Sequence, residues 1–461
     1  MGPKPADERS DHDLFRTELV NLIDQRHELA KLAELIDWPA FAQQWGSQFE
    51  STTGRPALAT RLMAALLYLK HVYALSDEDV VERWVENPYW QHFSGERYFR
   101  HELPCDPSSL VRWRKRIGEA GCEWLLAHSI EAASKAGVIK RRSLDTVVLD
   151  TTVQPKAIAH PTDSRLLNRA REQLVAAAQD AGIVLRQSYA RVGKAAETQA
   201  GRYAHAKQFN RMRREIRKLR TWLGRVIRDV QRKAAAVGGE VAGALKDKLD
   251  IAQRLHAQQR DSKNKLYALH APEVECLAKG MARTPYEFGV KVSVAVTATE
   301  GLVVGMRSMP GNPYDGHTVD SQLEQVEILT GKTPKIALAD RGYRGVEPAC
   351  GARLLISHTR RLPKRLKKLL KRRQVVEPMI GHMKADGLLG KNWLKGADGD
   401  ALNALLCGAG HNLRMILRHL RVLYCALWAL IAMAITLGME MATPTSRLNA
   451  VTSRRPALAR G

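Results

Sequence analysis

The sequence predicts an all-α N-terminal domain followed by an α/β domain, whose mixed sheet is interrupted by a helical insertion. Three observations support this fold class. Apolar residues recur every three or four positions before residue 140, β-branched strands begin near residue 143, and about 120 mostly helical residues separate the first strand from the next. The chain has 461 residues, enough for about three domains of ~150 residues.

Residues 1–140 are predicted to be helical. After Arg55-Pro56, one helix face is apolar: Leu58, Leu62, Leu66, Leu69 and Tyr73. Ser76 and Asp79 are spaced as a capping box, and Asp106 precedes a first-turn proline. The helix after Asp106 combines apolar and basic residues: Leu110, Trp113 and Ile117 with Arg112, Arg114, Lys115 and Arg116. This pattern fits a bundle with a solvated basic rim and equally a helix-turn-helix-like DNA reader.

The α/β domain is predicted at 141–420. The segment SLDTVVLDTTVQ is predicted to contain a buried strand that ends at Asp150. Strands are also predicted at 288–298 and 302–306, joined by a hairpin turn at 299–301, and at 335–339 and 354–357. A helix is predicted at 317–329. This alternation is typical of helices packed on a mixed sheet.

The insertion, at about 161–284, is predicted to be an antiparallel helical hairpin. Its first helix carries a heptad seam: Met212, Ile216, Leu219, Leu223, Val226 and Val230. After a loop at Gly238-Gly239, a second helix carries Val241, Leu245, Leu249 and Leu255. Residues 202–233 hold 12 Lys or Arg against two acids. A one-signed excess favours binding of backbone phosphates over a merely solvated face.

The overall charge indicates a polyanionic partner. Lys and Arg number 72 against 48 Asp and Glu, a net charge of +24, so nucleic acid or an anionic membrane surface is expected.

The six cysteines form no CxxC pair, which favours a reducing cytoplasm over a zinc ribbon or a disulfide framework. The polar first thirteen residues do not resemble a signal peptide.

The C-terminal region ends in an apolar helix and a tail. Residues 422–439 are uncharged, at the lower edge of what spans a bilayer, and a buried helix at 421–441 is favoured over a membrane span. Residues 442–461 are predicted to be disordered.

A dense basic run lies further upstream. Residues 360–373 hold nine Lys or Arg and no acid. We expect this run to bind substrate phosphates rather than to act as a nuclear-localisation signal.

Three carboxylates stand where phosphodiester chemistry needs them. Asp150 and Asp340 each follow a short apolar run, and Glu377 lies in a predicted helix soon after the last strand. Two divalent metal ions ~3.5–4 Å apart can activate a nucleophile and stabilise a leaving oxygen, and hard oxygen ligands suit Mg²⁺. Taken singly, each aspartate is more often a turn or cap residue.

The chain resembles the DDE transposases of bacterial insertion sequences. The resemblance runs from about residue 55 to 420, in RPALATRLMAALLYLKHVYALSDEDVVERW, VVLDTTVQPKAIAHPTDSRLL, LHAPEVECLAKG, YEFGVKVSVA, PGNPYDGHT, ALADRGYRG and VVEPMIGHMKADGLLGKNWLKG. It implies a helical DNA-binding domain and an RNase H-like catalytic domain. In that domain Asp150, Asp340 and Glu377 would bind two divalent cations, Mg²⁺ or Mn²⁺.

The family signature around the glutamate is Tyr, two residues, Arg, three residues, Glu, six residues, Lys. Arg373, Glu377 and Lys384 match it and share one helical face, whereas Leu370 replaces the tyrosine. Arg373 and Lys384 are therefore expected to hold substrate phosphate beside a metal ligand. Arg373 could also be one more member of the basic run.

Other candidates support weaker claims. Asp145 is expected to be structural, and Asp315 to cap the helix near His317 rather than act in catalysis. Tyr343 could stack on DNA or lie at the edge of the core. His382 forms no HExxH pattern, and no His/Cys set has zinc spacing.

The expected function is transposition: binding of terminal inverted repeats and target DNA, strand cleavage and strand transfer. DNA contacts are expected from Arg373, Lys384, Arg213, Arg217, Arg220, Arg112, Arg114 and Tyr343. Two DNA ends must be held together, so a homodimer or higher oligomer is expected, in the bacterial cytoplasm at the nucleoid, without stable membrane association. An inactive DNA-binding derivative and a membrane-associated basic protein are the alternatives.

Overall fold

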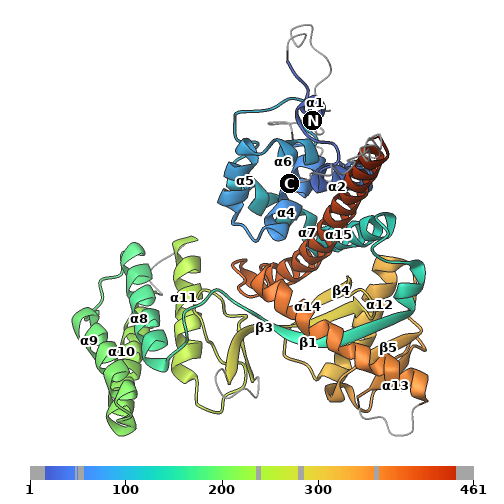
Figure 1. The fold of residues 1–461 in the computed structure, drawn as a ribbon. Helices are drawn as coiled ribbons and strands as arrows, with labels where there is room; N and C mark the ends of the chain where they lie inside the picture. The colour runs from blue at the N-terminus through green and yellow to red at the C-terminus, as the bar shows by residue number, and fades with distance from the viewer. Residues whose placement is uncertain are drawn as a thin grey trace, which may run out of the picture.

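The computed structural model describes residues 16–46, 49, 57–234, 240–278, 285–357 and 363–442, with side chains described as far as residue 425 in the last range. Figure 1 shows an N-terminal group of helices above a sheet, with the insertion to one side. The sequence segments 1–15, 235–239 and 443–461 lie outside the described residues, and the expected C-terminal tail lies almost wholly among them.

The N-terminal region is helical, as predicted. Its helices are α1 (Leu19–Leu22), α2 (Glu28–Leu35), α3 (Trp38–Gly46), α4 (Thr60–Val72), α5 (Asp77–Glu86), α6 (Pro88–Phe93) and α7 (Pro107–Lys135). Ser76 and Asp79 form the predicted capping box, and the Asp106 side chain accepts from Ser108 N. Gly118 (φ 60°, ψ −162°) interrupts α7, so the basic first half and the buried second half are separate helical segments.

The described residues form a six-stranded mixed sheet. Its strands are β1 (Thr146–Pro155), β2 (Glu275–Ala278), β3 (Tyr286–Thr297), β4 (Val303–Met309), β5 (Ile336–Ala339) and β6 (Arg353–Ile356). The order is β2-β3-β1-β5-β6, and β4 also pairs with β3. β1 is antiparallel to β3 and parallel to β5, and β5 is parallel to β6. The predicted strands are confirmed, whereas β2 was not predicted.

Four further helices belong to this part of the chain: α12 (Val319–Thr330), between β4 and β5, and α13 (Lys364–Lys371), α14 (Val376–Ala385) and α15 (Gly396–Ala442), after β6. Short 3-10 turns precede several elements: η3 (Arg141–Asp145), η4 (Asp315–Thr318), η5 (Arg341–Tyr343) and η6 (Arg372–Val375). The helix predicted at 317–329 is therefore present as η4 and α12.

The insertion contains four described helices, not the predicted hairpin. They are α8 (Asp163–Asp180), α9 (Ala190–His205), α10 (Phe209–Ala234) and α11 (Glu240–Ala257). The predicted seam on α10 is buried from Leu219 to Val230 and packs with Leu245 and Leu255 of α11. The same core includes Leu167 and Leu174 of α8. The prediction was wrong in helix number because α8 carries its own apolar stripe, which also has to be buried.

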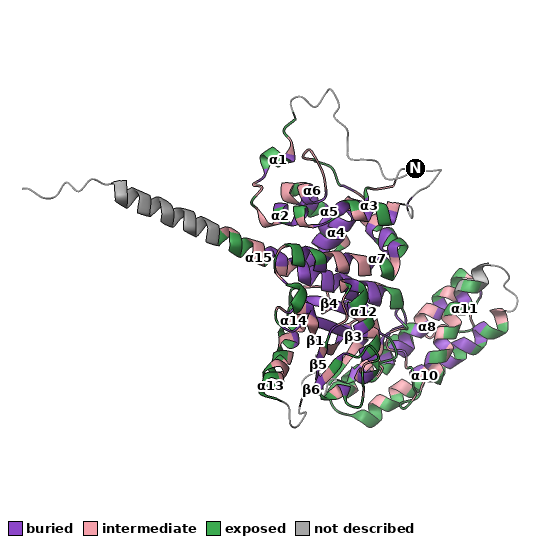
Figure 2. Cartoon of the chain, turned by 90° about the vertical axis from the view of Figure 1, so that its right-hand side faces the viewer, coloured by how far each residue is buried: buried purple, intermediate pink, exposed green. Residues whose placement is uncertain are grey.

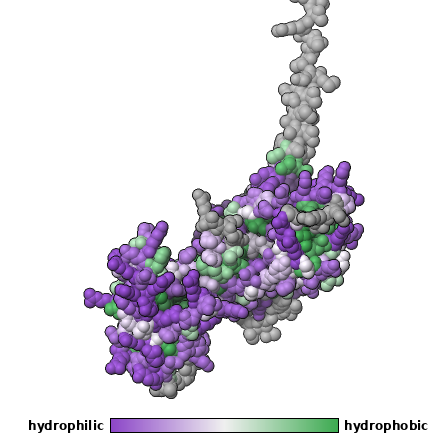
Figure 3. Space-filling model, turned by 90° about the horizontal axis from the view of Figure 1, so that it is seen from below, coloured by the Kyte–Doolittle hydropathy of each residue, from purple (hydrophilic) through white to green (hydrophobic). Residues whose placement is uncertain are grey.

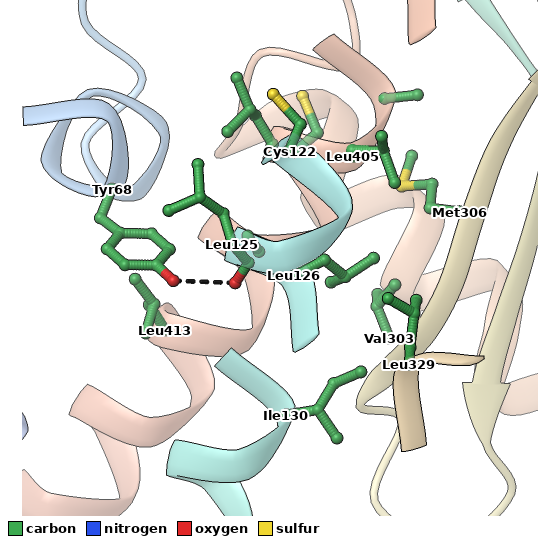
Figure 4. Close-up of a cluster of buried hydrophobic side chains, with 14 of the residues drawn as sticks. Tyr68, Cys122, Leu125, Leu126, Ile130, Val303, Met306, Leu329, Leu405 and Leu413 are labelled. Carbon is green, nitrogen blue, oxygen red and sulfur yellow. Dashed lines mark hydrogen bonds between the residues drawn. The ribbon is translucent and has the colours of Figure 1, made fainter. Parts of the chain in front are cut away.

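One hydrophobic core joins the N-terminal helices to the sheet. Figure 4 shows its centre, where Leu125, Leu126 and Ile130 of α7 lie between α4, α15 and the sheet. The Tyr68 hydroxyl donates to Leu125 O at 2.8 Å within this core. In Figure 2 the buried residues run continuously from the N-terminal helices through the first part of α15 into the sheet. The site region and the N-terminal region are therefore mechanically connected.

The apolar segment 422–439 belongs to α15, with no break at residue 421. Val422 is 62% exposed and Leu423 is 51% exposed, so the expected packing on the catalytic domain is absent where this segment begins. The side chains from 426 onward lie outside the description. Within the described residues, none of the helices is both apolar and long enough to span a bilayer.

Candidate active site

Asp150 and Asp340 lie at neighbouring positions of two parallel strands. The β1–β5 register pairs Val147 with Ala337 and Val148 with Leu338. Asp150 lies two residues beyond Val148 on β1, and Asp340 lies two residues beyond Leu338, directly after the end of β5. Asp150 was predicted to end its strand, and this prediction was wrong. β1 continues beyond Asp150 because β3 pairs with it as far as Pro155. Asp150 stands instead where β1 loses its parallel neighbour, next to the end of β5 that Asp340 follows.

Each of these carboxylates is held by a backbone N–H group. Asp150 Oδ1 accepts from Thr151 N at 2.8 Å, and Asp340 Oδ1 accepts from Gly342 N at 2.7 Å. Within the described residues, neither Oδ2 atom receives a hydrogen bond. One oxygen of each side chain is therefore fixed, and the other remains available for a ligand.

The electrostatics of Asp150 indicate which charged groups surround it. Burial raises its pKa from 3.8 to about 6, against the lowering effect of the Thr151 N–H group. The negative charges of Asp340 and Glu377 raise this pKa further, whereas Arg373 lowers it. The structure therefore brings Asp150, Asp340, Glu377 and Arg373 into one electrostatic neighbourhood.

The residues of the glutamate signature lie on η6 and α14. Glu377 is in the first turn of α14 with its side chain 63% exposed, and its Oε1 is 3.5 Å from Arg373 Nη2. Lys384 Nζ is 3.7 Å from Glu287 Oε2, at the start of β3. Leu370, which replaces the signature tyrosine, packs against the core. Arg373 thus directly neighbours Glu377, while Lys384 is oriented toward a different acid.

Asp315 lies in the site and does not cap its helix. Tyr314 is the N-cap of η4, and the Asp315 side chain makes no capping hydrogen bond. Asp315 Oδ1 instead accepts from Thr151 Oγ1 at 3.0 Å and pairs with Lys291 Nζ at 2.9 Å. The predicted cap was wrong because these two partners on β1 and β3 compete for the carboxylate. A lysine within the apolar strand segment FGVKVSVAV was the sequence signal for this contact.

Tyr343 is a core residue. Its side chain is 1% exposed, so the ring cannot stack on DNA, and the core-edge alternative is correct. Burial raises the pKa of its hydroxyl, and the charges of Asp150, Asp315 and Asp340 raise it further. The hydroxyl makes no hydrogen bond of normal geometry in the described structure, although Thr318 lies close by.

The donor set suits a hard divalent cation, but the ligands do not converge fully. Among the described residues, no three His, Cys, Asp or Glu side chains are arranged to hold a metal ion in this conformation. A Cβ at Gly342 would lie 2.9 Å from both Asp315 Oδ2 and Asp340 Oδ1, so these two carboxylates come close to each other at this glycine. Carboxylate oxygens are the ligands that Mg²⁺ and Mn²⁺ prefer.

The expected DNA contacts on α7 divide into one surface residue and one buried residue. Arg114 is 2% exposed and pairs bidentately with Asp77, with Nη1–Oδ1 at 2.7 Å and Nη2–Oδ2 at 2.5 Å. Lys70 Nζ also lies 2.7 Å from Asp77 Oδ1. Arg114 therefore cannot contact DNA as predicted, because its charge is used inside the fold. Arg112 is exposed and, among the described residues, bonds to Ser108 in its own helix.

The basic residues of the insertion remain on its surface. Arg213 and Arg217 are exposed, whereas Arg220 is half-buried and donates to Gln258 O at 2.9 Å. Figure 3 shows the insertion, at the left, with a predominantly hydrophilic surface. These residues are on α10 and Arg112 is on α7, so the structure does not bring them to the carboxylates on β1 and β5 (Figure 1).

Comparisons with known proteins each cover less than half of the chain. Residues 17–116, which run from α1 to the first half of α7, match the family model described as "Transposase domain (DUF772)". The chain is 56% identical over 198 residues to a Rhizobium meliloti protein described as "Uncharacterized protein ORF8 in nfe locus". That match covers 43% of this chain and 95% of the other protein. No solved structure matches the chain.

Proposed function

We propose that this chain, which matches a transposase-domain family over residues 17–116, is the DDE transposase of an insertion sequence. In this proposal it binds the terminal inverted repeats of its mobile element, hydrolyses a phosphodiester at each end, and joins the free 3′-hydroxyl to target DNA. Both reactions are in-line displacements at phosphorus, so one site can perform them.

The observation that carries the proposal is the position of Asp150 and Asp340. Both stand at the fork where β5 ends and β1 continues, with one oxygen of each side chain fixed by a backbone N–H group. The sheet around the fork has β1 antiparallel to β3 and parallel to β5 and β6. This arrangement is compatible with an RNase H-like catalytic domain.

Asp150, Asp340 and Glu377 would hold two Mg²⁺ or Mn²⁺ ions. When bound, the ions would activate the attacking oxygen and stabilise the leaving one. The chain must supply ionised carboxylates, and Asp150 is mostly ionised only above pH 6. Glu377 would have to exchange Arg373 for the metal, and the released guanidinium would then be available for a DNA phosphate.

DNA binding would use separate surfaces. Arg112 on the first half of α7 lies within the matched transposase domain, and we assign recognition of the inverted repeats to this region. Arg213 and Arg217 on α10 would contact backbone phosphates. Since two ends react together, the active form would be a homodimer or higher oligomer, located at the nucleoid in the cytoplasm.

The test uses single Ala replacements of Asp150, Asp340 and Glu377 in the full-length protein. Each is expected to abolish Mg²⁺-dependent cleavage of a labelled duplex carrying the element's end, while duplex binding stays near the parent level. Glu327→Ala is the control, since Glu327 is an exposed acid on α12. Cleavage near the parent rate in any of the three variants would remove that residue from the site.

A non-catalytic DNA-binding role is the competing candidate. The contact between Glu377 and Arg373 favours it, because this contact keeps the third carboxylate with a cation rather than with the two aspartates. The same assay separates the two functions. Specific duplex binding by the parent protein without nicking in Mg²⁺ or Mn²⁺ would support the non-catalytic role.

A further inference from the structure

The insertion contains a hollow that the proposed function leaves unused. It has a volume of about 690 Å³ and lies between the loop after α8 and the second half of α10. Its lining residues are Arg186, Gln187, Tyr189, Arg225, Arg228, Asp229, Gln231 and Arg232. We call it the arginine hollow. Sites for small organic ligands are lined mostly by apolar side chains, so this lining indicates an anionic ligand instead.

The buried acid Asp229 joins the two sides of the arginine hollow. Its Oδ2 accepts from Arg186 N at 2.8 Å, which attaches the loop after α8 to α10. Its Oδ1 lies 3.2 Å from Arg232 Nη2 and 3.3 Å from Lys233 Nζ. These groups lower the pKa of Asp229, the Arg186 N–H group most of all. Asp229 is therefore ionised at neutral pH, and both of its oxygens already have partners.

The four arginines of the hollow carry more positive charge than Asp229 can offset. Arg225, Arg228 and Arg232 share one face of α10, because they are three and then four residues apart, and all three are exposed. Arg186 adds a fourth exposed guanidinium from the loop. Within the described residues, the guanidinium groups of Arg186 and Arg228 have neither a hydrogen bond nor a salt bridge. A bound anion would relieve the repulsion among these groups.

Tyr189 holds one rim of the hollow in a defined position. Its ring stacks on Trp222 of α10, with centroids 5.8 Å apart and planes 13° apart, and its hydroxyl accepts from Arg225 Nη1 at 3.4 Å. Tyr189 has a φ of 54°, in the left-handed region that bulky side chains rarely adopt. The loop is thus fixed against α10 by contacts at both Tyr189 and Asp229, and the hollow exists before a ligand arrives.

A phosphate group of DNA is the anion that fits this lining best. Guanidinium groups bind phosphate oxygens through paired, charge-assisted hydrogen bonds, and glutamine amides also donate to phosphates. Arg228 lies 11 residues after Arg217, which is three helical turns or roughly 16 Å along the same face of α10. A duplex that contacts Arg217 would therefore continue toward the hollow. The phosphates form the outer ridges of a duplex, and a ridge fits a concave site.

We propose that the arginine hollow binds a phosphodiester group of the DNA backbone at one defined position, with Arg186 and Arg228 as principal donors. This inference rests on the proposed function for the identity of its ligand, DNA, but it requires no strand cleavage. Contacts from a convex helix face permit the duplex to slide. A concave site with donors on two segments fixes where the insertion sits along the DNA.

The test measures binding of the full-length protein to a duplex carrying the element's end, in the presence of a chelator. Changing Arg186 and Arg228 together to Gln should weaken binding about 10-fold or more, since hydrogen bonds to charged groups are lost. Arg191→Gln with Arg202→Gln is the matched control. Both arginines are exposed on α9 and outside the lining, so this variant loses the same charge and should weaken binding clearly less. Thermal unfolding shows that each variant is folded.

A second measurement locates the phosphate that the hollow binds. Neutral methylphosphonate groups are placed one at a time along the duplex. In the parent protein and in the control variant, neutralising the bound phosphate should weaken binding. In the Arg186→Gln, Arg228→Gln variant the same replacement should have no further effect, because its partners are already absent.

The outcomes separate this inference from the proposed function. Equal weakening by both double variants, with no position-specific methylphosphonate effect, would overturn the site, because the charge would then act non-specifically. Parent DNA affinity in the Arg186→Gln, Arg228→Gln variant, with calorimetric binding of inorganic phosphate lost, would assign the hollow to a free anion and overturn the DNA contact. A parent protein that shows the methylphosphonate effect but does not cleave DNA with Mg²⁺ or Mn²⁺ would support the hollow and refute the catalytic proposal.

Discussion

Replacing Asp150 with Asn should stabilise the metal-free protein at neutral pH. The pKa of Asp150 is about 6 in the fold against 3.8 as its ordinary value, first because of burial and then because of Asp340. Between these pH values the folded protein holds a proton that the unfolded chain has lost, so stability falls as pH rises through this window. At ~1.4 kcal/mol per pH unit, the ionised carboxylate costs up to about 3 kcal/mol above pH 6.

The assay is thermal unfolding between pH 4 and 8 in the presence of a chelator. Asn cannot ionise, so Asp150→Asn should melt several degrees higher at pH 7.5 and lose this advantage below pH 4. Asp145→Asn is the control, since the Lys332 ammonium, 2.8 Å from Asp145 Oδ1, lowers the pKa of Asp145. Its stabilising effect exists above the ordinary pKa, so this variant should melt lower at neutral pH. An equal decrease in both variants at pH 7.5 would refute the proposed crowding of carboxylates around Asp150.

Three further predictions concern DNA binding and the fold. With 6–10 phosphate contacts, affinity for DNA should fall by ~10³–10⁵ between 50 and 200 mM salt; a flat dependence in filter binding would assign the +24 charge another role. Changing Arg213, Arg217 and Arg220 to Gln together should weaken binding to inverted-repeat and random duplexes by similar factors; selective loss of the repeat would mean that α10 reads sequence. Asp77→Ala should cost ~3–5 kcal/mol of unfolding free energy in urea by leaving Arg114 buried without its partner, whereas Arg112→Gln should weaken DNA binding with unchanged stability.

The sequence predicted those parts of the site that depend on local pattern. Short β-branched runs identified β1 and β5, and the acids that follow them stand out because carboxylates are rare in buried strands. The length of β1 was not predictable in this way. β1 continues past Asp150 because β3 pairs with it as far as Pro155, and that partner is more than 130 residues away in the chain.

Contacts between distant segments account for two of the residues whose roles were misassigned. Arg114 was predicted to be one of several basic surface residues, but it lies four residues after Leu110 and three before Ile117, on the face that is buried. That spacing was a usable signal for burial. For Asp315 the local pattern was also that of a cap, and the signal for its contact lay elsewhere in the chain, in the lysine of the apolar segment FGVKVSVAV.

The insertion leaves and rejoins the sheet at a single buried anchor. Lys156, directly after β1, lies 2.9 Å from Glu273 Oε1 and 2.7 Å from Asp400 Oδ1, so the two ends of the insertion meet at the start of α15. Asn392 Nδ2 also donates to Asp400 Oδ1 at 2.6 Å, which ties the segment after α14 to the same point. A buried charge with two acid partners has a defined geometry and is costly to disturb. Because β1 carries Asp150 and α14 carries Glu377, this anchor connects the two carboxylate-bearing elements near the point where the insertion begins and ends.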